Sequence, residues 1–173
     1  MLLEEGVFAR HVGKRLLLDS NLFLVLLAGA VDRRLFGSFK RISTYSVADY
    51  EFLERLVSRF SILLTTPHIL TEVGNLATSL HEQLRQEWNR KVASLLLCQQ
   101  SNPGVKEHWT PASQLSAMPE FISFGLADAA VADLSSEALV VTDDYRLSGY
   151  LQQKRLSVLN FRDLRRIQQA LWL

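Results

Sequence analysis

Two short apolar runs, far apart in this chain of 173 residues, each end in an aspartate. One is the Leu-Leu-Leu run that ends at Asp19, and the other is the Leu-Val-Val-Thr run that Asp143 and Asp144 follow. Runs of this length and character predict strands that are buried on both faces of a sheet. Because the carboxyl ends of parallel strands line the ligand crevice of an open α/β sheet, these acids are expected at one edge of it.

Segments with helical periodicity alternate with the short apolar runs, which is typical of βαβ units. Strands are predicted over residues 16–18, 61–64, 139–142 and 157–160. Helices are predicted over 22–30, 46–59, 84–99, 126–136, 145–154 and 161–171, with another that begins at Thr66-Pro67. Residues 32–44 are expected to form a loop or short helix, and residues 109–118 an irregular connection. The pattern predicts an α/β fold, a three-layer α/β/α sandwich of one domain over residues 1–173.

Composition excludes several classes of protein. The apolar content of 48% is that of a globular chain. The single cysteine, Cys98, rules out an internal disulfide and a cysteine zinc cluster, and we expect it to be a small buried residue at a helix end. The longest uncharged apolar stretch, residues 22–31, is much shorter than the roughly 20 residues of a membrane helix. With its acidic start, the chain is expected to be cytoplasmic.

Two further acids precede the second strand-end pair. Glu72 lies in the Thr66-Pro67 helix on a polar stripe, and Asp128 lies among small apolar residues. Each acid also has a structural interpretation, such as a helix cap at Asp19 or a solvent-facing Glu72 near a helix N-terminus. Carboxylates that meet at one sheet edge repel one another, and a divalent cation removes the repulsion. Oxygen ligands suit Mg²⁺ or Mn²⁺ rather than Zn²⁺.

The neighbours of these acids suggest supporting roles. Adjacent side chains after a strand point apart, so one of Asp143 and Asp144 is expected to enter the site while the other faces solvent or supports it. Asn21 follows Asp19 closely enough to orient it or to bind a metal-bound water. The formal net charge of +1 permits a nucleic-acid partner, since electrostatic steering depends on the local field rather than on the total.

The order of these motifs resembles that of PIN-domain proteins. The resemblance rests on Leu-Leu-Leu-Asp19-Ser-Asn21, Thr66-Pro-His-Ile-Leu-Thr-Glu72-Val, Gly125-Leu-Ala-Asp128-Ala-Ala-Val-Ala and Val-Val-Thr142-Asp-Asp144-Tyr-Arg-Leu. It covers about residues 15 to 160 and implies a Rossmann-like, mostly parallel sheet of four to five strands. It also implies that Asp19, Glu72, Asp128 and Asp144 are the catalytic and metal-binding acids, with Asn21, Thr142 and Asp143 in support.

The resemblance further implies that the chain is a Mg²⁺- or Mn²⁺-dependent endoribonuclease. Toxin-type PIN proteins of bacteria and archaea are one group to which such a chain could belong. About fourteen residues before the first strand and an expanded segment 32–44 set the chain apart from the small toxin-type members. RNA is the expected substrate, and an antitoxin partner and a homodimer are left open. The alternative is a non-catalytic PIN-like module that binds RNA or protein. A phosphohydrolase of the same sheet class lacks support because no Asp-x-Asp follows the first strand.

Overall fold

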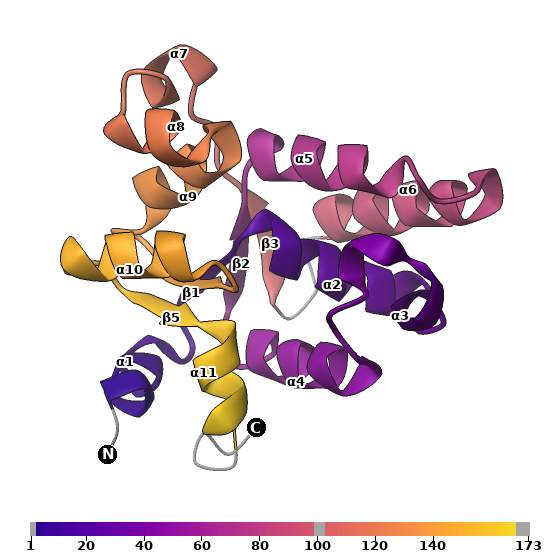
Figure 1. Ribbon diagram of the computed structural model, residues 1–173, viewed down its shortest axis with the longest axis horizontal. Helices are drawn as coiled ribbons and strands as arrows, with labels where there is room; N and C mark the ends of the chain where they lie inside the picture. Colours follow the sequence, from indigo (N-terminus) through magenta and orange to yellow (C-terminus); the bar gives the residue numbers. More distant parts are fainter. Residues whose placement is uncertain (1–2, 99–102, 169–173) are drawn as a thin grey trace.

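Within residues 3–98 and 103–168, the part of the chain that this computed structural model describes, five parallel strands form one central sheet (Figure 1). The strands are β1 (Arg15–Leu18), β2 (Ile62–Thr65), β3 (Gly104–Glu107), β4 (Leu139–Thr142) and β5 (Val158–Asn160). Their order across the sheet is β3-β2-β1-β4-β5. Leu17 of β1 pairs with Leu64 of β2 on one side and with Val140 of β4 on the other.

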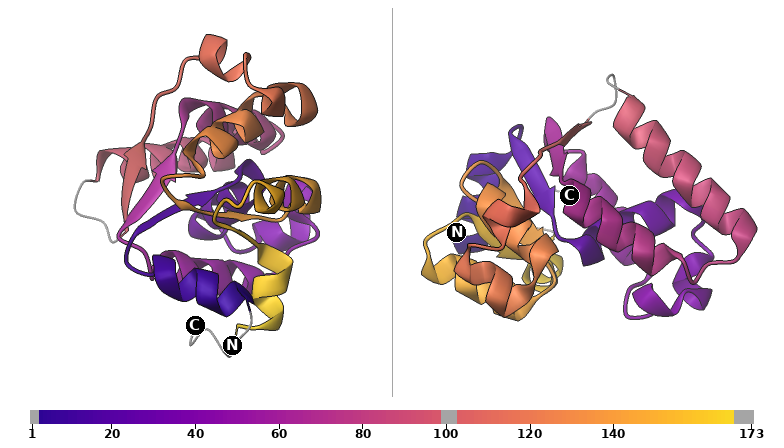
Figure 2. Two further views of the ribbon diagram at one scale, coloured as in Figure 1. Left: turned by 90° about the vertical axis from the view of Figure 1, so that its left-hand side faces the viewer. Right: turned by 90° about the horizontal axis from the view of Figure 1, so that it is seen from above.

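Helices cover the sheet on both sides (Figures 1 and 2). On one side lie α2 (Ser20–Val31), α4 (Val47–Val57), α5 (Pro67–Ala77) and α6 (Glu82–Leu97). On the other side lie α9 (Leu126–Leu134) and α10 (Tyr145–Gln153). The remaining elements are α1 (Leu3–His11), α3 (Leu35–Ser38), the 3₁₀ helix η1 (Lys40–Ile42), α7 (Ala112–Leu115), α8 (Pro119–Phe124) and α11 (Phe161–Arg166). The predicted Rossmann-like three-layer sandwich is therefore confirmed.

The core explains why the strands read as continuous apolar runs. Leu16, Leu17 and Leu18 of β1 and Val140 of β4 are fully buried, because helices cover both faces of the sheet. Helix α2 is apolar nearly all round for the same reason, since it lies between β1, α4 and α6. It begins at once after β1, so that the first strand and the first helix together fix the direction of Asp19.

The structure also contains elements that the sequence pattern did not predict. Strand β3 was missed because this edge strand is half exposed and contains only one large apolar residue, Val105. Helices α1 and α8 were missed as well, and part of the predicted irregular connection forms α7. The prediction that Cys98 is buried was wrong, because it follows the last turn of α6 with its side chain exposed.

No helix in the described part of the chain has the length and apolar character needed to cross a membrane. The predicted helices at 84–99 and 161–171 extend past residue 98 and residue 168, so their last residues lie outside the described ranges.

Candidate acidic site

The strand order changes direction between β1 and β4. From β1 the chain continues through β2 to β3 on one side of the sheet, and then returns to β4 and β5 on the other. Ligands of open α/β sheets bind at such a switch point, outside the carboxyl ends of the two strands. Asp19 directly follows β1, and Asp143 and Asp144 directly follow β4, so all three strand-end acids lie at this switch point.

Asp19 is buried and joins the ends of the two strands. It caps α2, because its Oδ1 accepts a hydrogen bond from the Leu22 N–H (2.8 Å). Its Oδ2 accepts hydrogen bonds from the Thr142 hydroxyl and from the Asp143 N–H (3.1 Å). Burial raises the pKa of Asp19 to about 6, although these three hydrogen bonds oppose the shift. Both interpretations of Asp19 thus meet in one side chain, which is a helix cap and a buried acid.

Asp144 is a second helix cap at the same edge. Its Oδ1 accepts hydrogen bonds from the N–H groups of Arg146 (2.6 Å) and Leu147 (3.2 Å) at the start of α10. Its own N–H donates to the Thr142 hydroxyl (3.0 Å), which in turn donates to Asp19. Thr142 is fully buried, so its hydroxyl links the two capping acids in a fixed arrangement.

Asp143 is held by two side chains from distant segments of the chain. The Tyr45 hydroxyl donates to its Oδ2 (2.8 Å), and the Arg162 guanidinium donates from Nε to its Oδ1 (2.8 Å). The ion pair with Arg162 compensates its charge. Asp143 is therefore the ion-paired acid of the two, whereas Asp144 lies close enough to Asp128 to raise its pKa.

Glu72 approaches the same edge from α5. Thr66 caps this helix with its hydroxyl, and Pro67 occupies its first position, as the sequence pattern predicted. Glu72 is exposed, and its Oε2 accepts a short hydrogen bond from the hydroxyl of Ser20 (2.6 Å) at the start of α2. His68, one turn earlier, contacts the carbonyl of Thr110 through Nε2 (2.9 Å).

Asp128 lies in the first turn of α9, after Gly125, whose φ of 91° lets the chain turn from α8 into α9. The side chain is half-buried, and no described residue donates a hydrogen bond to it. Burial, together with the negative charges of Asp19, Glu72 and Asp144, raises the pKa of Asp128 to about 7. The three other acids therefore lie close enough to Asp128 to disfavour its ionisation.

Two pockets adjoin these acids. The first, of about 340 Å³, lies between α5 and the α8–α9 turn and includes Glu72, Asp128 and Phe124 in its lining. The second, of about 400 Å³, is formed by Asn21 on α2, the segment around η1, the residues after β4, and α11. The remaining residues that line this second pocket are Arg41, Thr44, Tyr45, Asp143, Asp144, Tyr145 and Arg162.

The four predicted acids are neighbours, but their carboxylates do not converge into one closed set of ligands. In residues 3–98 and 103–168, no three or more His, Cys, Asp or Glu side chains form an arrangement that could hold a metal ion. Hydrogen bonds that cap helices orient Asp19 and Asp144. The exposed Glu72 accepts one hydrogen bond from a hydroxyl, and Asp128 accepts none from any residue that the structure describes. The donor set nevertheless fits a hard divalent cation, because it consists of carboxylate oxygens whose mutual repulsion is not compensated.

The sequence interpretation missed three residues of the site. Ser20 could have been found, since it lies between Asp19 and Asn21 and a hydroxyl there can reach a neighbouring acid. Tyr45 and Arg162 carried no comparable signal, because they contact Asp143 only after distant segments pack together. Asp133, on α9, also contacts a distant segment, since its Oδ2 accepts a hydrogen bond from the buried Thr110 hydroxyl (2.9 Å).

The surrounding basic residues are only partly available. Arg33 and Arg34 form ion pairs with Glu51 and Asp32, so their charges are compensated locally.

Comparison of the chain with protein-family models, with curated proteins and with solved structures finds no match in any of the three.

Proposed function

We propose that this protein is a PIN-like, Mg²⁺- or Mn²⁺-dependent endoribonuclease that hydrolyses RNA at the cluster of Asp19, Glu72, Asp128 and Asp144. The observation that carries the proposal is Asp128, a half-buried carboxylate without a described donor that lies beside three other acids, and whose pKa is raised by burial and by those acids. A fold gains no stability when carboxylates repel one another, whereas a divalent cation needs several carboxylates close together as its ligands.

Asp19, Glu72, Asp128 and Asp144 would hold the ion. About four lone-pair positions are available on a carboxylate, and Asp19 uses three of them for described donors, so one remains on Oδ1. Glu72 and Asp128 are the two of these four acids without helix-capping bonds, so they keep carboxylate lone pairs available to an ion. The bound ion would supply a lowered pKa for a water nucleophile and compensation of charge on the phosphoryl oxygens.

The chain's own residues provide the fixed framework for this chemistry. The Thr142 hydroxyl and the caps of α2 and α10 keep Asp19 and Asp144 at a constant separation. The Ser20 hydroxyl holds Glu72 at the border of the first pocket. Acids that are already in place lose little conformational entropy when charge develops beside them, which favours the transition state.

A polymeric substrate is favoured over a small phosphate ester by the surfaces on both sides of the cluster. At the first pocket the Arg146 guanidinium lies over the Phe124 ring (5.6 Å), and at the second pocket Arg162 lies over the Tyr145 ring (5.4 Å). Cations and aromatic faces are the groups that bind phosphates and bases of nucleic acids. An RNA substrate would also suit the expected cytoplasmic location, and a toxin-type role with an antitoxin remains part of the proposal.

The test is cleavage of a labelled single-stranded RNA with Mg²⁺, with Mn²⁺ and with EDTA. We expect EDTA to abolish cleavage, and Asp19→Asn and Asp128→Asn each to lower its rate by about 100-fold or more. Asp163→Asn, which changes an acid outside the cluster, is the matched control and should retain the rate. Cleavage that persists in EDTA, or in both cluster variants, would contradict the proposal.

The second candidate is a non-catalytic PIN-like module that binds RNA or a protein. The lack of a closed ligand arrangement among the described residues favours it. Calorimetric titration with Mn²⁺ near neutral pH separates the two candidates, because only the nuclease requires the acids to bind the ion. An absence of heat, together with an absence of cleavage, would favour the binding module.

A further inference from the structure

The second pocket adjoins the acidic cluster but is chemically different from it. Its acids, Asp143 and Asp144, are already engaged, the first by Arg162 and Tyr45 and the second by the N-terminus of α10. The pocket also presents Arg41 and Tyr145, together with the short polar side chains of Asn21 and Thr44. An anionic ligand would therefore meet an Asp143 that is ion-paired, an Asp144 whose Oδ1 already accepts two backbone hydrogen bonds, and available donors.

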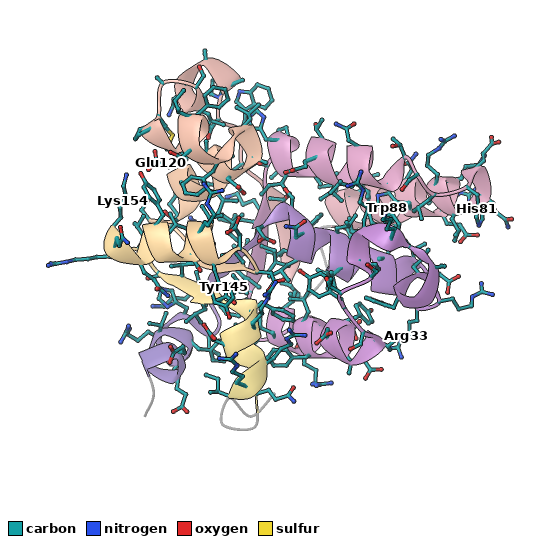
Figure 3. All side chains as sticks on the ribbon, viewed as in Figure 1. Arg33, His81, Trp88, Glu120, Tyr145 and Lys154 are labelled. Atoms are coloured by element: carbon teal, nitrogen blue, oxygen red, sulfur yellow. The ribbon has the colours of Figure 1, made fainter. Side chains whose placement is uncertain are left out.

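Tyr145 presents an aromatic face at this pocket. It begins α10, between that helix and α11, and 49% of it is exposed, so the ring contributes little to the core (Figure 3). The Arg162 guanidinium lies over the ring, 5.4 Å from its centre, and Asp143 holds Arg162 in turn. The ring is therefore supported by a fixed cation, while about half of its surface remains open to a ligand.

Arg41 carries a positive charge that has no ion-pair partner among the described residues. It is exposed in η1, and no described acid forms an ion pair with it, in contrast to Arg33 and Arg34. Asn21 and Thr44 are exposed beside it and can donate hydrogen bonds to phosphate or sugar oxygens. This pocket of about 400 Å³ therefore offers a guanidinium for a phosphate, an aromatic face for a base, and small donors for phosphate or sugar oxygens. These are the parts of one nucleotide.

We propose that this pocket is a nucleotide subsite, in which Tyr145 stacks an unpaired base of the RNA and Arg41 binds the adjoining phosphate. The inference rests on the proposed nuclease function, since Asp144 borders the pocket and belongs to the acidic cluster. The subsite therefore takes a nucleotide next to the bond that is cut. A base within a duplex cannot offer its face to Tyr145, so the subsite selects single-stranded RNA.

The experiment measures binding of a single-stranded RNA that carries 2-aminopurine, in EDTA so that no cleavage occurs. Stacking on Tyr145 quenches the 2-aminopurine fluorescence, and anisotropy of a terminal dye reports the affinity. Tyr145→Leu should weaken binding by about 5- to 100-fold and abolish the quench, while Tyr145→Phe should retain both. Arg41→Gln should weaken binding and reduce its salt dependence, with the quench retained in the bound fraction.

Arg85→Gln, at an exposed arginine of α6, is the matched charge control and should bind as the wild-type protein does. Wild-type affinity in Tyr145→Leu, equal affinity for the matching duplex, or no binding of RNA at all would each overturn the subsite.

Cleavage assays with Mg²⁺ keep the two proposals apart. Binding and quenching that depend on Tyr145, without any cleavage, would leave the subsite and remove the nuclease. Cleavage that depends on Asp128, with an unchanged KM in Tyr145→Leu and Arg41→Gln, would leave the nuclease and remove the subsite.

Discussion

At the scale of single residues, the acids of the site differ in what holds them. Asp19 and Asp144 form helix caps, and Asp143 forms an ion pair with Arg162. Asp128 has no such partner among the described residues, and its pKa lies near neutrality. The free energy of unfolding should therefore respond to the ionisation of Asp128 more than to that of Asp19, whose pKa is raised to about 6.

Asp128→Asn is expected to stabilise the protein at pH 8 when no divalent cation is present. Because the folded state raises the pKa of Asp128 from 3.8 to about 7, its contribution to stability is present at low pH and is lost progressively as the pH rises between these two values. Removing the charge should raise the free energy of unfolding by about 1 to 2 kcal/mol at pH 8, and by much less at pH 5.

Urea denaturation in EDTA at the two pH values measures this difference. Asp163→Asn serves as the control, because it removes an acid outside the cluster. A variant that is less stable than the wild-type protein at pH 8 would show that Asp128 is not under repulsion.

Thr142→Val is expected to destabilise the protein, and more so as the pH rises from 5 to 8. The substitution removes the donor to Asp19 and the acceptor of the Asp144 N–H, at a cost of about 1 to 3 kcal/mol. Since the lost hydrogen bond lowers the pKa of Asp19, that pKa should rise further above about 6, and the ionised form should become more costly. Thr142→Ser keeps the hydroxyl and should restore most of the loss, as denaturation curves at both pH values would reveal.

At the scale of elements, the site depends on how α2 is packed. Helix α2 carries Asp19 at its N-terminus and lies against α4, where Gly29 faces the ring of the buried Tyr50. A Cβ at position 29 would overlap that ring, so the glycine is required by close approach of the two helices. The same ring packs against Phe36 and lies under the Arg33 guanidinium, so moving it away from α2 would disturb these contacts.

Gly29→Ala is therefore expected to lower the free energy of unfolding by about 1 to 3 kcal/mol. Gly74→Ala on α5 is the matched control, because nothing lies within reach of a Cβ there. Alanine favours a helix over glycine by about 1 kcal/mol, so the control should be neutral or stabilising. Thermal melts of the two variants measure the contrast, and equal melting temperatures would contradict the close approach.

A second contact between elements supports the wall of the first pocket. Glu120 of α8 is almost completely buried and accepts hydrogen bonds from Tyr150 (2.8 Å) and Lys154 (2.6 Å), which joins α8 to the end of α10 (Figure 3). The Phe124 and Tyr150 rings pack together in the same region, with their centres 5.3 Å apart. These contacts hold the turn from α8 into α9, and so the position of Asp128.

At the scale of the whole molecule, the order of the strands brings the acids together. β1 and β4 are neighbours in the sheet although their paired positions, such as Leu16 and Leu139, are 123 residues apart in the sequence. The cluster consequently exists only in the folded chain. A ligand that binds the cluster must stabilise the fold by mass action.

Mn²⁺ is therefore expected to stabilise the wild-type protein at pH 8. A concentration of 100 times the dissociation constant adds about 2.7 kcal/mol to the free energy of unfolding. Asp128→Asn should lose most of this gain although it is the more stable protein in EDTA. Thermal melts with Mn²⁺ and with EDTA test the prediction, and an equal rise for both proteins would place the ion elsewhere.

Much of the fold could be predicted from local patterns. Strands β1 and β4 and helices α2 and α5 have apolar runs, caps and proline positions that are typical of their structure wherever they occur. Strand β3 could not be recognised in this way, because an edge strand with polar residues has no pattern of its own.

The sequence by itself determined that acids follow the ends of two buried strands, since strand burial and chain order are local properties. Only the tertiary structure decided which of the two aspartates after β4 is paired, because Tyr45 lies 98 residues from Asp143 and reaches it through packing. It also decided that Asp128 is left without a described donor beside three other acids. Hydrogen bonds and charge interactions depend on distances in space, which residue order alone does not specify.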